Sequence, residues 1–123
     1  MISFDHFHPQ DGIPIYLQIV KHIKSGIVSG TVRSGDEVPS RRVLSSLLGI
    51  NPNTIQKAYK ILEDEHLMAS HTGAKSYMSF DDATVALVRQ QLLKGDAMAV
   101  IHSLKQMGLN KQEALALIET HWE

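Results

Sequence analysis

Residues 39–67 read PSRRVLSSLLGINPNTIQKAYKILEDEHL, and the surrounding chain can be interpreted outward from this stretch. Its pattern predicts two short helices joined by a tight turn, the second over about residues 52–65. At about 100° of rotation per residue, the second helix has an apolar side and a polar side. The apolar side holds Ile55, Ala58, Tyr59 and Leu62, and the polar side holds Asn53, Gln56, Lys57 and Lys60. Such a helix can be anchored in a core by one side while the other side contacts a DNA groove.

Start and stop signals divide the first half of the chain into three helices. Pro14 suits the first position of a helix that ends near Gly30, and isoleucine recurs at every fourth position within it. Ser40 is a natural N-cap for the next helix, and Gly49 supplies its left-handed stop. Asn51, followed by a proline, caps the third helix. The apolar stripe expected on the middle helix consists of Val43, Leu44, Leu47 and Leu48.

A change of period after residue 67 predicts a small β-hairpin. Residues 68–71 and 76–80 are short extended stretches on either side of Thr72-Gly73-Ala74-Lys75, a turn that contains glycine. Three helices followed by a hairpin make a winged helix-turn-helix. We therefore predict a mainly helical α+β fold in which residues 1–80 form this winged domain.

Residues 81–123 are predicted to form a tail of two helices. Asp81 and Asp82 offer caps for the first of them, Gly95-Asp96 marks a candidate bend, and a capping box at Asn110 starts the second. The tail is too short to form a core of its own, yet it has more apolar residues than a solvated extension keeps. Because a two-fold partner buries one self-complementary patch twice, we expect these residues to be a dimerisation region.

Composition narrows the class of protein. The 123 residues are 43% hydrophobic, which suits one domain with a short appendage. No apolar run approaches the roughly 20 residues of a membrane-spanning helix, and residues 1–10 lack the features of a signal peptide. The sequence has no cysteine, which removes disulfides, thiolate zinc sites and cysteine nucleophiles and agrees with a reducing compartment. We expect a cytoplasmic protein with no membrane partner.

The formal net charge of −1 at first argues against a polyanionic partner, but the charges are unevenly spread. Residues 1–80 carry a small basic excess, whereas residues 81–123 carry an acidic one. The cations that can converge near a phosphate backbone are Arg41, Arg42, Lys57 and Lys75. A local basic surface is therefore compatible with the overall charge.

Three blocks of the sequence resemble the successive signature blocks of GntR-type transcription regulators. They are PIYLQI at residues 14–19, SGTVRSGDEVPSRR at residues 29–42 and NPNTIQKAY at residues 51–59. The resemblance covers residues 14–78, with the blocks in the expected order and spacing. A tail of only two helices, too short for a ligand-binding domain, is similar to that of the YtrA subfamily.

This resemblance implies a bacterial homodimer joined through the helices of residues 81–123. It also implies a repressor, commonly of a transporter operon, whose partner is double-stranded operator DNA. Because two recognition helices related by a dyad meet successive major-groove segments, the operator is expected to be an inverted repeat. No cofactor is implied, and a small-molecule effector stays unknown.

The sequence departs from the family pattern at two places. His66 stands where the family usually has glycine, at a helix end that often needs a left-handed residue. The wing tip of the family reads Gly-x-Gly, whereas Gly73-Ala74-Lys75 lacks the second glycine. These departures concern the end of the recognition helix and the wing, and they leave the helix itself unchanged.

The predicted DNA contacts begin with the polar side of residues 52–65. Asn53 and Gln56 carry amides that donate and accept at once against an adenine edge, a pairing worth about 1–3 kcal/mol of discrimination. We predict that they read bases, and that Lys57 reaches a guanine or a phosphate. The residues suited to phosphate oxygens near helix N-termini are Ser40, Arg42 and Thr54. By resemblance, the wing residues Thr72, Gly73 and Lys75 lie along the backbone or in the minor groove.

Simpler interpretations compete for several of these residues. Asn51 is better placed as a cap than as a base contact, and Thr54 can serve only to close the first turn. Lys60 lies a further turn from the helix start and is interpreted as a solvated lysine. Arg41 and Arg42 can be ordinary surface charges, although the resemblance favours Arg42 as a phosphate contact.

Other functional classes find less support. The seven histidines are scattered without the i, i+4 pairing of a helical metal site, and no nucleophile with a base, phosphate loop or paired carboxylates is recognisable. We therefore expect neither a metal site nor an enzyme. Two alternatives stay open: a winged helix that binds a protein partner, and an effector-responsive switch with a small-molecule site between the winged domain and the tail.

Overall fold

The computed structural model describes residues 1–70 and 75–123. It forms two compact units, Met1–Arg89 and Gln90–Glu123, and the division between them falls within a long helix. The predicted residues Thr72 and Gly73, together with the end of the predicted first hairpin strand at His71, lie outside the described residues.

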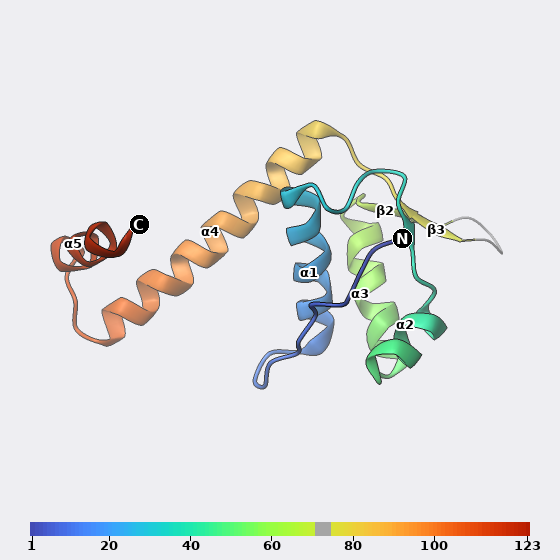
Figure 1. The fold of residues 1–123 in the computed structure, drawn as a ribbon, viewed down its shortest axis with the longest axis horizontal. Coiled ribbons are helices and arrows are strands. Elements are labelled where there is room, and N and C mark those ends of the chain that lie inside the picture. Colours follow the sequence, from blue (N-terminus) through green and yellow to red (C-terminus); the bar gives the residue numbers. More distant parts are fainter. Residues whose placement is uncertain (71–74) are drawn as a thin grey trace. The chain divides into compact units, whose positions relative to one another are not determined.

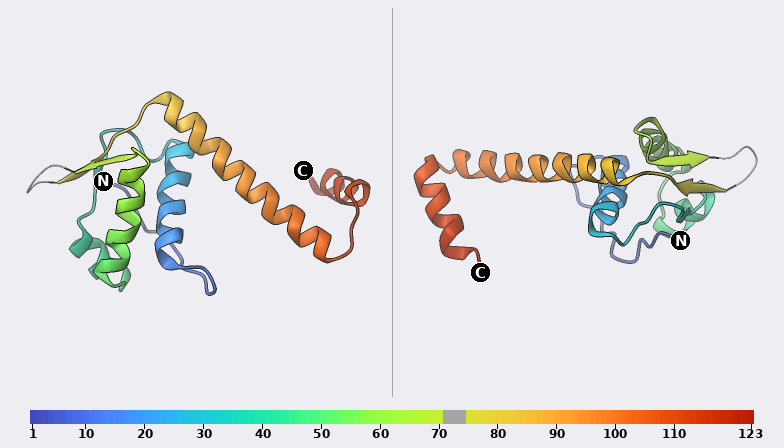
Figure 2. Two further views of the ribbon diagram at one scale, coloured as in Figure 1. Left: turned by 180° about the vertical axis from the view of Figure 1, so that it is seen from behind. Right: turned by 90° about the horizontal axis from the view of Figure 1, so that it is seen from above.

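The first unit is built around three helices that follow the predicted boundaries closely (Figure 1). They are α1 (Ile15–Ser29), α2 (Arg41–Leu48) and α3 (Pro52–Asp64). Both α1 and α2 pack against α3, and the two views of Figure 2 show α1 and α3 side by side. All four residues predicted on the apolar side of α3 are buried. The side chains that are almost wholly enclosed are Ile19, Ile23, Leu44, Ile55, Leu62, Leu67 and Met78.

A three-stranded antiparallel sheet adjoins these helices, in the order β1-β3-β2. Its strands are β1 (Glu37–Val38), β2 (Met68–Ser70) and β3 (Ser76–Met78). The predicted hairpin is the β2–β3 pair, with Met68 opposite Met78 and Ser70 opposite Ser76. The sequence pattern predicts no strand before Pro39, so β1 is an addition to the expected fold. A strand of two residues is too short to show an alternating pattern.

The helix ends use the signals that the sequence predicts. Ser40 Oγ accepts a hydrogen bond from the Val43 N–H at 3.1 Å, and Gly49 is left-handed with φ of 67°. His66 also adopts a left-handed conformation, with φ of 61°. The Leu67 N–H donates to the Leu62 carbonyl at 2.9 Å and the His66 N–H to the Glu63 carbonyl at 3.0 Å, which together close α3 as a Schellman motif. Histidine therefore takes the conformation for which the family usually has glycine.

The stripe predicted on α2 is only partly buried. Leu44 is fully buried, but Val43 and Leu47 leave 53% and 65% of their surfaces exposed. The reason is angular: α2 packs against α3 along the side that holds Leu44, and Val43 and Leu47 share a direction turned away from it. Val43 and Leu47 therefore belong to the stripe but not to the core.

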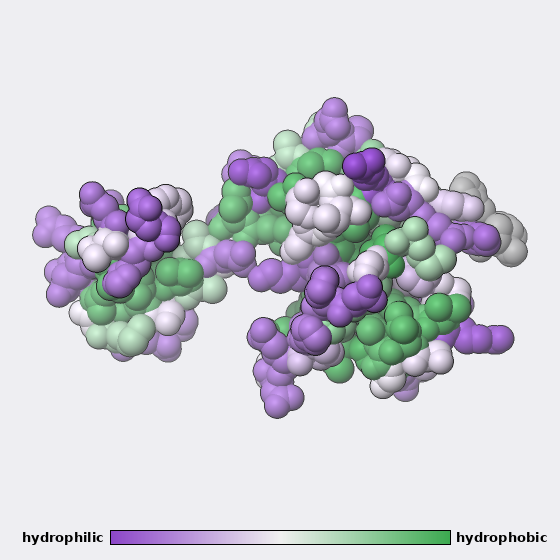
Figure 3. Space-filling view, in the orientation of Figure 1, coloured by the Kyte–Doolittle hydropathy of each residue, from purple (hydrophilic) through white to green (hydrophobic). Residues whose placement is uncertain are grey.

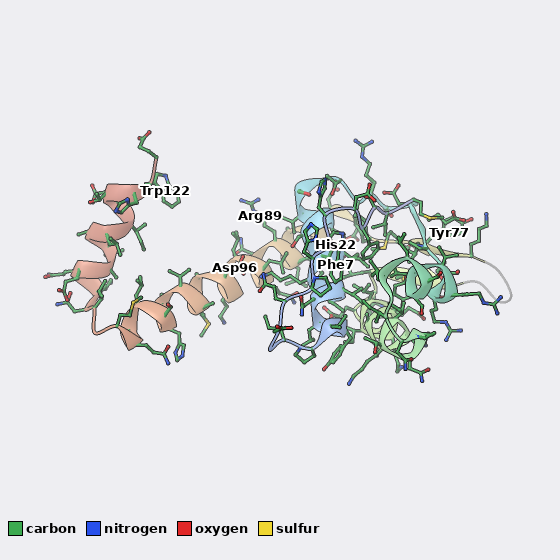
Figure 4. The ribbon with its side chains drawn as sticks, turned by 60° about the horizontal axis from the view of Figure 1, so that its bottom comes forward. Phe7, His22, Tyr77, Arg89, Asp96 and Trp122 are labelled. Atoms are coloured by element: carbon green, nitrogen blue, oxygen red, sulfur yellow. The ribbon has the colours of Figure 1, made fainter. Side chains whose placement is uncertain are left out.

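The segment before α1 packs onto the first unit. Ile2 and Phe4 are buried, and the Ile2 N–H donates to the Glu37 carbonyl at 3.3 Å. His22 on α1 stacks on the ring of Phe4 with 4.7 Å between centroids, and Phe7 meets the same histidine edge-on (Figure 4). His22 Nε2 also lies 2.9 Å from the Ser3 carbonyl. This packing accounts for one of the seven histidines as a structural residue.

The remaining helices are α4 (Asp82–Gln106) and α5 (Lys111–His121). The carboxylate of Asp81 caps α4 by accepting from the Thr84 N–H at 2.8 Å and from its hydroxyl at 2.7 Å, and these bonds lower the pKa of Asp81. The helix continues without interruption through the predicted bend at Gly95-Asp96. The capping box predicted at Asn110 is present at the start of α5, with both of its hydrogen bonds.

Candidate nucleic-acid interface

The side of α3 that faces away from the core is the starting point of the interface. Asn53, Gln56, Lys57 and Lys60 are all exposed, whereas the opposite side of the helix is buried. Asn51 caps the helix, since its side-chain oxygen accepts from the Asn53 N–H at 2.8 Å. The cap uses that oxygen within the chain and agrees with the simpler interpretation of Asn51. The amide side chains of Asn53 and Gln56 stay at the surface.

Three contacts with residues outside the helix fix the orientation of α3. The Tyr59 hydroxyl donates to the Pro39 carbonyl at 2.7 Å, and burial raises the pKa of Tyr59, so that the phenol stays protonated. Lys24 Nζ on α1 lies 2.7 Å from the Glu65 carboxylate, just after the helix ends. On the wing side, the Ser70 hydroxyl donates to Glu63 at 3.1 Å. The exposed amides therefore project from a helix whose C-terminal half is tied to its surroundings.

A groove of about 670 Å³, here called the central groove, runs between α2, α3 and the sheet. Gln56 lines it from α3, Arg41 and Val43 line it from α2, and Glu37 and Lys75 line it from the sheet side. Glu63 also lines it, so that two acidic and two basic side chains surround the groove among the described residues. A groove of this kind offers hydrogen-bonding groups of both kinds, which suits a base edge better than it suits a phosphate.

A second groove of about 810 Å³, here called the arginine groove, lies at the N-termini of α2 and α3. No acidic side chain lines it within the described residues. Its lining consists of Ser40, Arg41, Arg42, Ser45, Ser46 and Pro52. Two guanidinium groups, serine hydroxyls and the start of a helix all favour an anion, so this groove is chemically suited to a phosphate.

Two predicted cations are engaged within the chain. Lys57 Nζ lies 4.1 Å from the centre of the Tyr16 ring on α1, a cation–π contact. Lys75 Nζ lies 3.0 Å from a Glu37 carboxylate oxygen, and this hydrogen bond and the negative charge of Glu37 raise the pKa of Lys75. Both lysines are exposed. Thr54 is half-buried and its N–H donates to the Asn51 carbonyl at 3.0 Å, as expected for a residue in the first turn.

Some of the predicted residues line a groove and others line none. Gln56 and Lys75 line the central groove, Arg42 lines the arginine groove, and Ser40 lines both. Asn53, Thr54 and Lys57 line neither groove. Sequence reasoning gave little weight to Arg41, which lines both grooves, and it missed Glu37 and Val43. The position of Arg41 next to the predicted Arg42 could have indicated that it lines a groove. No neighbouring residue in the sequence indicates the same for Glu37.

Comparison with known proteins assigns the family. Residues 15–77 match the model of the family described as bacterial regulatory proteins, gntR family. The chain belongs to this family. It is a DNA-binding transcriptional regulator of the GntR type, as the sequence blocks predict, and the matched family and relatives are transcriptional regulators and not enzymes.

Two relatives from Bacillus subtilis (strain 168) are similar over most of their length. The HTH-type transcriptional repressor YtrA is 35% identical over 107 residues, which are 87% of this chain and 75% of YtrA. The HTH-type transcriptional regulator YhcF is 30% identical over 114 residues, which are 93% of this chain and 94% of YhcF. The predicted likeness to YtrA is therefore confirmed beyond the winged domain.

Solved structures give the same family assignment. A GntR family transcriptional regulator from Listeria monocytogenes is 32% identical, with a TM-score of 0.77 over 91% of this chain and 98% of that one. The AraR DNA-binding domain in complex with operator ORR3 is 25% identical, with a TM-score of 0.51 over 59% of this chain and 88% of that one. The predicted mainly helical fold with a small wing is confirmed.

Two further observations concern other classes of partner. None of the helices in the described part of the chain has the length and apolar character needed to cross a membrane. Within residues 1–70 and 75–123, no three histidine or acidic side chains come together as a metal site.

Proposed function

We propose that this GntR-type regulator is a cytoplasmic homodimeric repressor that binds an inverted-repeat operator, one of a transporter-type operon. The observation that carries the proposal is the exposure of the Asn53 and Gln56 amides on a helix whose opposite side is fully used by the core. Such a helix can enter the major groove without any rearrangement of its own domain. The B. subtilis relative YtrA is named a transcriptional repressor, which supports repression over activation.

The predicted contacts divide into base reading and phosphate binding. Gln56 lines the central groove and Asn53 precedes it by almost one turn of α3, so both amides are available to adenine edges. Arg42, with Ser40 beside it, belongs to the arginine groove and binds phosphate, with Thr54 at the start of α3 in the same role. Lys57 reaches a base or a phosphate. Lys75, with Thr72 and Gly73, places the wing along the backbone.

The tail completes the proposal. We keep residues 1–80 as the DNA-binding domain and residues 81–123 as the dimerisation region. The exposed apolar side chains of α4 and α5 support this division, because a second copy of the chain would cover them. The two linked DNA-binding domains then bind two operator halves at once, which raises the affinity for an inverted repeat over that for a single half.

The test compares alanine at Gln56 with alanine at Arg42, using an operator selected by the wild-type protein from a random DNA pool. Gln56→Ala should relax the preference at one base pair of each half-site, at a cost of about 1–3 kcal/mol for the preferred base. Arg42→Ala should weaken binding to all sequences alike and reduce the salt slope by about one.

Lys60→Ala is the matched control for both variants. Lys60 is exposed on the same side of α3, one turn beyond Gln56, and its Nζ lies 3.5 Å from Asp64. Its replacement should change neither the preferred sequence nor the affinity by more than about twofold. Failure of the wild-type protein to enrich any sequence would contradict the proposed function, and equal losses of both kinds for Gln56→Ala and Arg42→Ala would contradict the division of roles.

A further inference from the structure

Val43 is an exposed apolar side chain that lines the central groove, whose lining also includes the apolar side chain of Met1. It is the third residue of α2, and its N–H donates to the capping oxygen of Ser40, so its place in the first turn is fixed. More than half of its surface is exposed, and it lines the central groove together with Arg41 and Gln56. Figure 3 shows hydrophobic side chains gathered over α2.

The fold of the first unit gives no reason for an apolar residue at this position. Leu44, the next residue, supplies the buried contact between α2 and the core. A single exposed apolar side chain is common on protein surfaces and needs no explanation by itself. Val43 differs because it shares a groove with the residues that we propose to meet DNA. We therefore expect Val43 to contact the molecule that enters the central groove.

We infer that Val43 contacts the C5-methyl group of a thymine and so helps to determine the operator sequence. This inference rests on the proposed function and deepens it. Among the base edges of the major groove, the thymine methyl is the apolar feature, and apolar side chains are its natural contacts. Arginine and glutamine can read hydrogen-bonding groups but gain nothing from a methyl.

The shape of the residue supports this assignment. Valine is branched at Cβ and nearly fixed at χ1 in a helix, so a contact with its methyl groups costs little conformational entropy. Helical side chains lean toward the N-terminus of their helix, which here is the end that holds Ser40 and Arg41. Val43 therefore leans toward the groups that line both grooves, and not toward the far end of α2.

Gln56 extends the inference to the neighbouring bases. It lines the same groove from the opposite helix, and its amide suits an adenine. An apolar contact and an amide contact across one groove together favour A·T pairs. The structure thus assigns at least one thymine to each operator half, within reach of the position that Gln56 reads.

The experiment removes the methyl group alone. The operator selected by the wild-type protein is resynthesised as a series of duplexes. In each duplex, deoxyuridine replaces the thymine at one position of the half-site, and the replacement is made in both half-sites. The full chain and its variants are then titrated by fluorescence anisotropy. At one thymine per half-site, the replacement should weaken wild-type binding by about three- to fourfold for each half-site, the effect of one buried methyl-sized group. Val43→Ala should bind the natural operator more weakly and lose all sensitivity at that thymine.

Leu47→Ala is the matched control, because Leu47 is also an exposed apolar residue of α2 but does not line the central groove. It should keep the full deoxyuridine effect. Val43→Thr has the same shape with one methyl replaced by hydroxyl, and its deoxyuridine effect should fall between those of the wild type and Val43→Ala. Thermal unfolding of each variant confirms that the fold is retained, and Val43→Thr decides the outcome if Val43→Ala does not fold.

Three results would overturn the inference while leaving the proposed function in place. They are a selected half-site without thymine, wild-type binding that is indifferent to deoxyuridine at every thymine, and a deoxyuridine effect that persists unchanged in Val43→Ala. If the wild-type protein prefers no DNA sequence at all, the proposed function fails as well.

Discussion

The two compact units of this chain treat their apolar side chains in opposite ways. In Met1–Arg89, the helices enclose a core in which side chains such as Ile23 and Leu62 have no exposed surface. In Gln90–Glu123, all of whose residues are described, no residue is buried. Trp122, at the end of α5, has 81% of its surface exposed (Figure 4). The first unit encloses a core of its own, and the second does not.

This difference indicates how the two units can divide the work. Because the core of the first unit uses only one side of α3, the other side is free for a ligand, and the proposed ligand is DNA. The apolar side chains of the second unit stay in contact with water unless another molecule covers them, and the proposed partner is a second copy of the chain. The first unit has its core within a single copy of the chain. The second unit is expected to cover its apolar side chains only when two copies pair.

The largest expected effect comes from placing a charge in the second unit. Leu115 lies on α5 with 54% of its surface exposed. Leu115→Asp should convert the dimer to a monomer, because a buried unpaired carboxylate is costly. Affinity for the inverted repeat should then fall by about 100- to 10,000-fold, since the two DNA-binding domains are no longer linked and bind their half-sites separately. Sedimentation and operator titration measure the two effects.

Gln112→Asp is the matched control for this variant, since it adds the same charge to an exposed polar position of α5. It should leave both the dimer and the affinity in place. A Leu115→Asp protein that stays dimeric would show that this side of α5 is not the interface.

The next largest effect is on the free energy of unfolding, and it should differ between substitutions in the two units. Leu62→Ala removes a fully buried side chain from the first unit and should lower the free energy of unfolding by about 2–5 kcal/mol. Leu115→Ala, measured at concentrations where the protein is monomeric, should cost less than about 0.5 kcal/mol, because the side chain is exposed there. Urea denaturation of both variants gives the comparison. Equal losses would mean that the second unit buries its own apolar residues.

The smallest effect concerns the electrostatics of the first unit. Glu37 pairs with Lys75 across the sheet and adds a negative charge to the central groove. Glu37→Gln should release Lys75 for a phosphate and tighten operator binding by about two- to threefold, with a slightly steeper salt dependence. The dimer should be unaffected. Operator titrations at two salt concentrations test this, and weaker binding would indicate that Glu37 itself accepts a hydrogen bond from a base.

Much of the first unit could be predicted from the sequence because its signals are local. The burial of Ile55, Ala58, Tyr59 and Leu62 follows from helical periodicity, and the caps at Ser40 and Asn51 follow from residue type and spacing. These features depend on neighbours within a few positions. The same local logic identified the hairpin and the family blocks.

What could not be predicted depends on contacts between distant residues. The pairing of β1 with β3, the Lys57 contact with Tyr16 and the Lys75 contact with Glu37 arise only when separate elements meet. The exposure of Val43 depends on which side of α2 faces α3. The roles of the individual residues in DNA binding stay predictions, because they depend on a partner as well as on the fold.

The most direct test of the central claim, that the exposed side of α3 reads a DNA sequence, is a ratio of two affinities. The wild-type protein is titrated, at physiological salt, with its selected operator and with a duplex of equal length and composition in which both half-sites are scrambled. We predict that the selected operator binds at least about 1,000-fold more tightly. Equal affinities for the two duplexes would contradict the account.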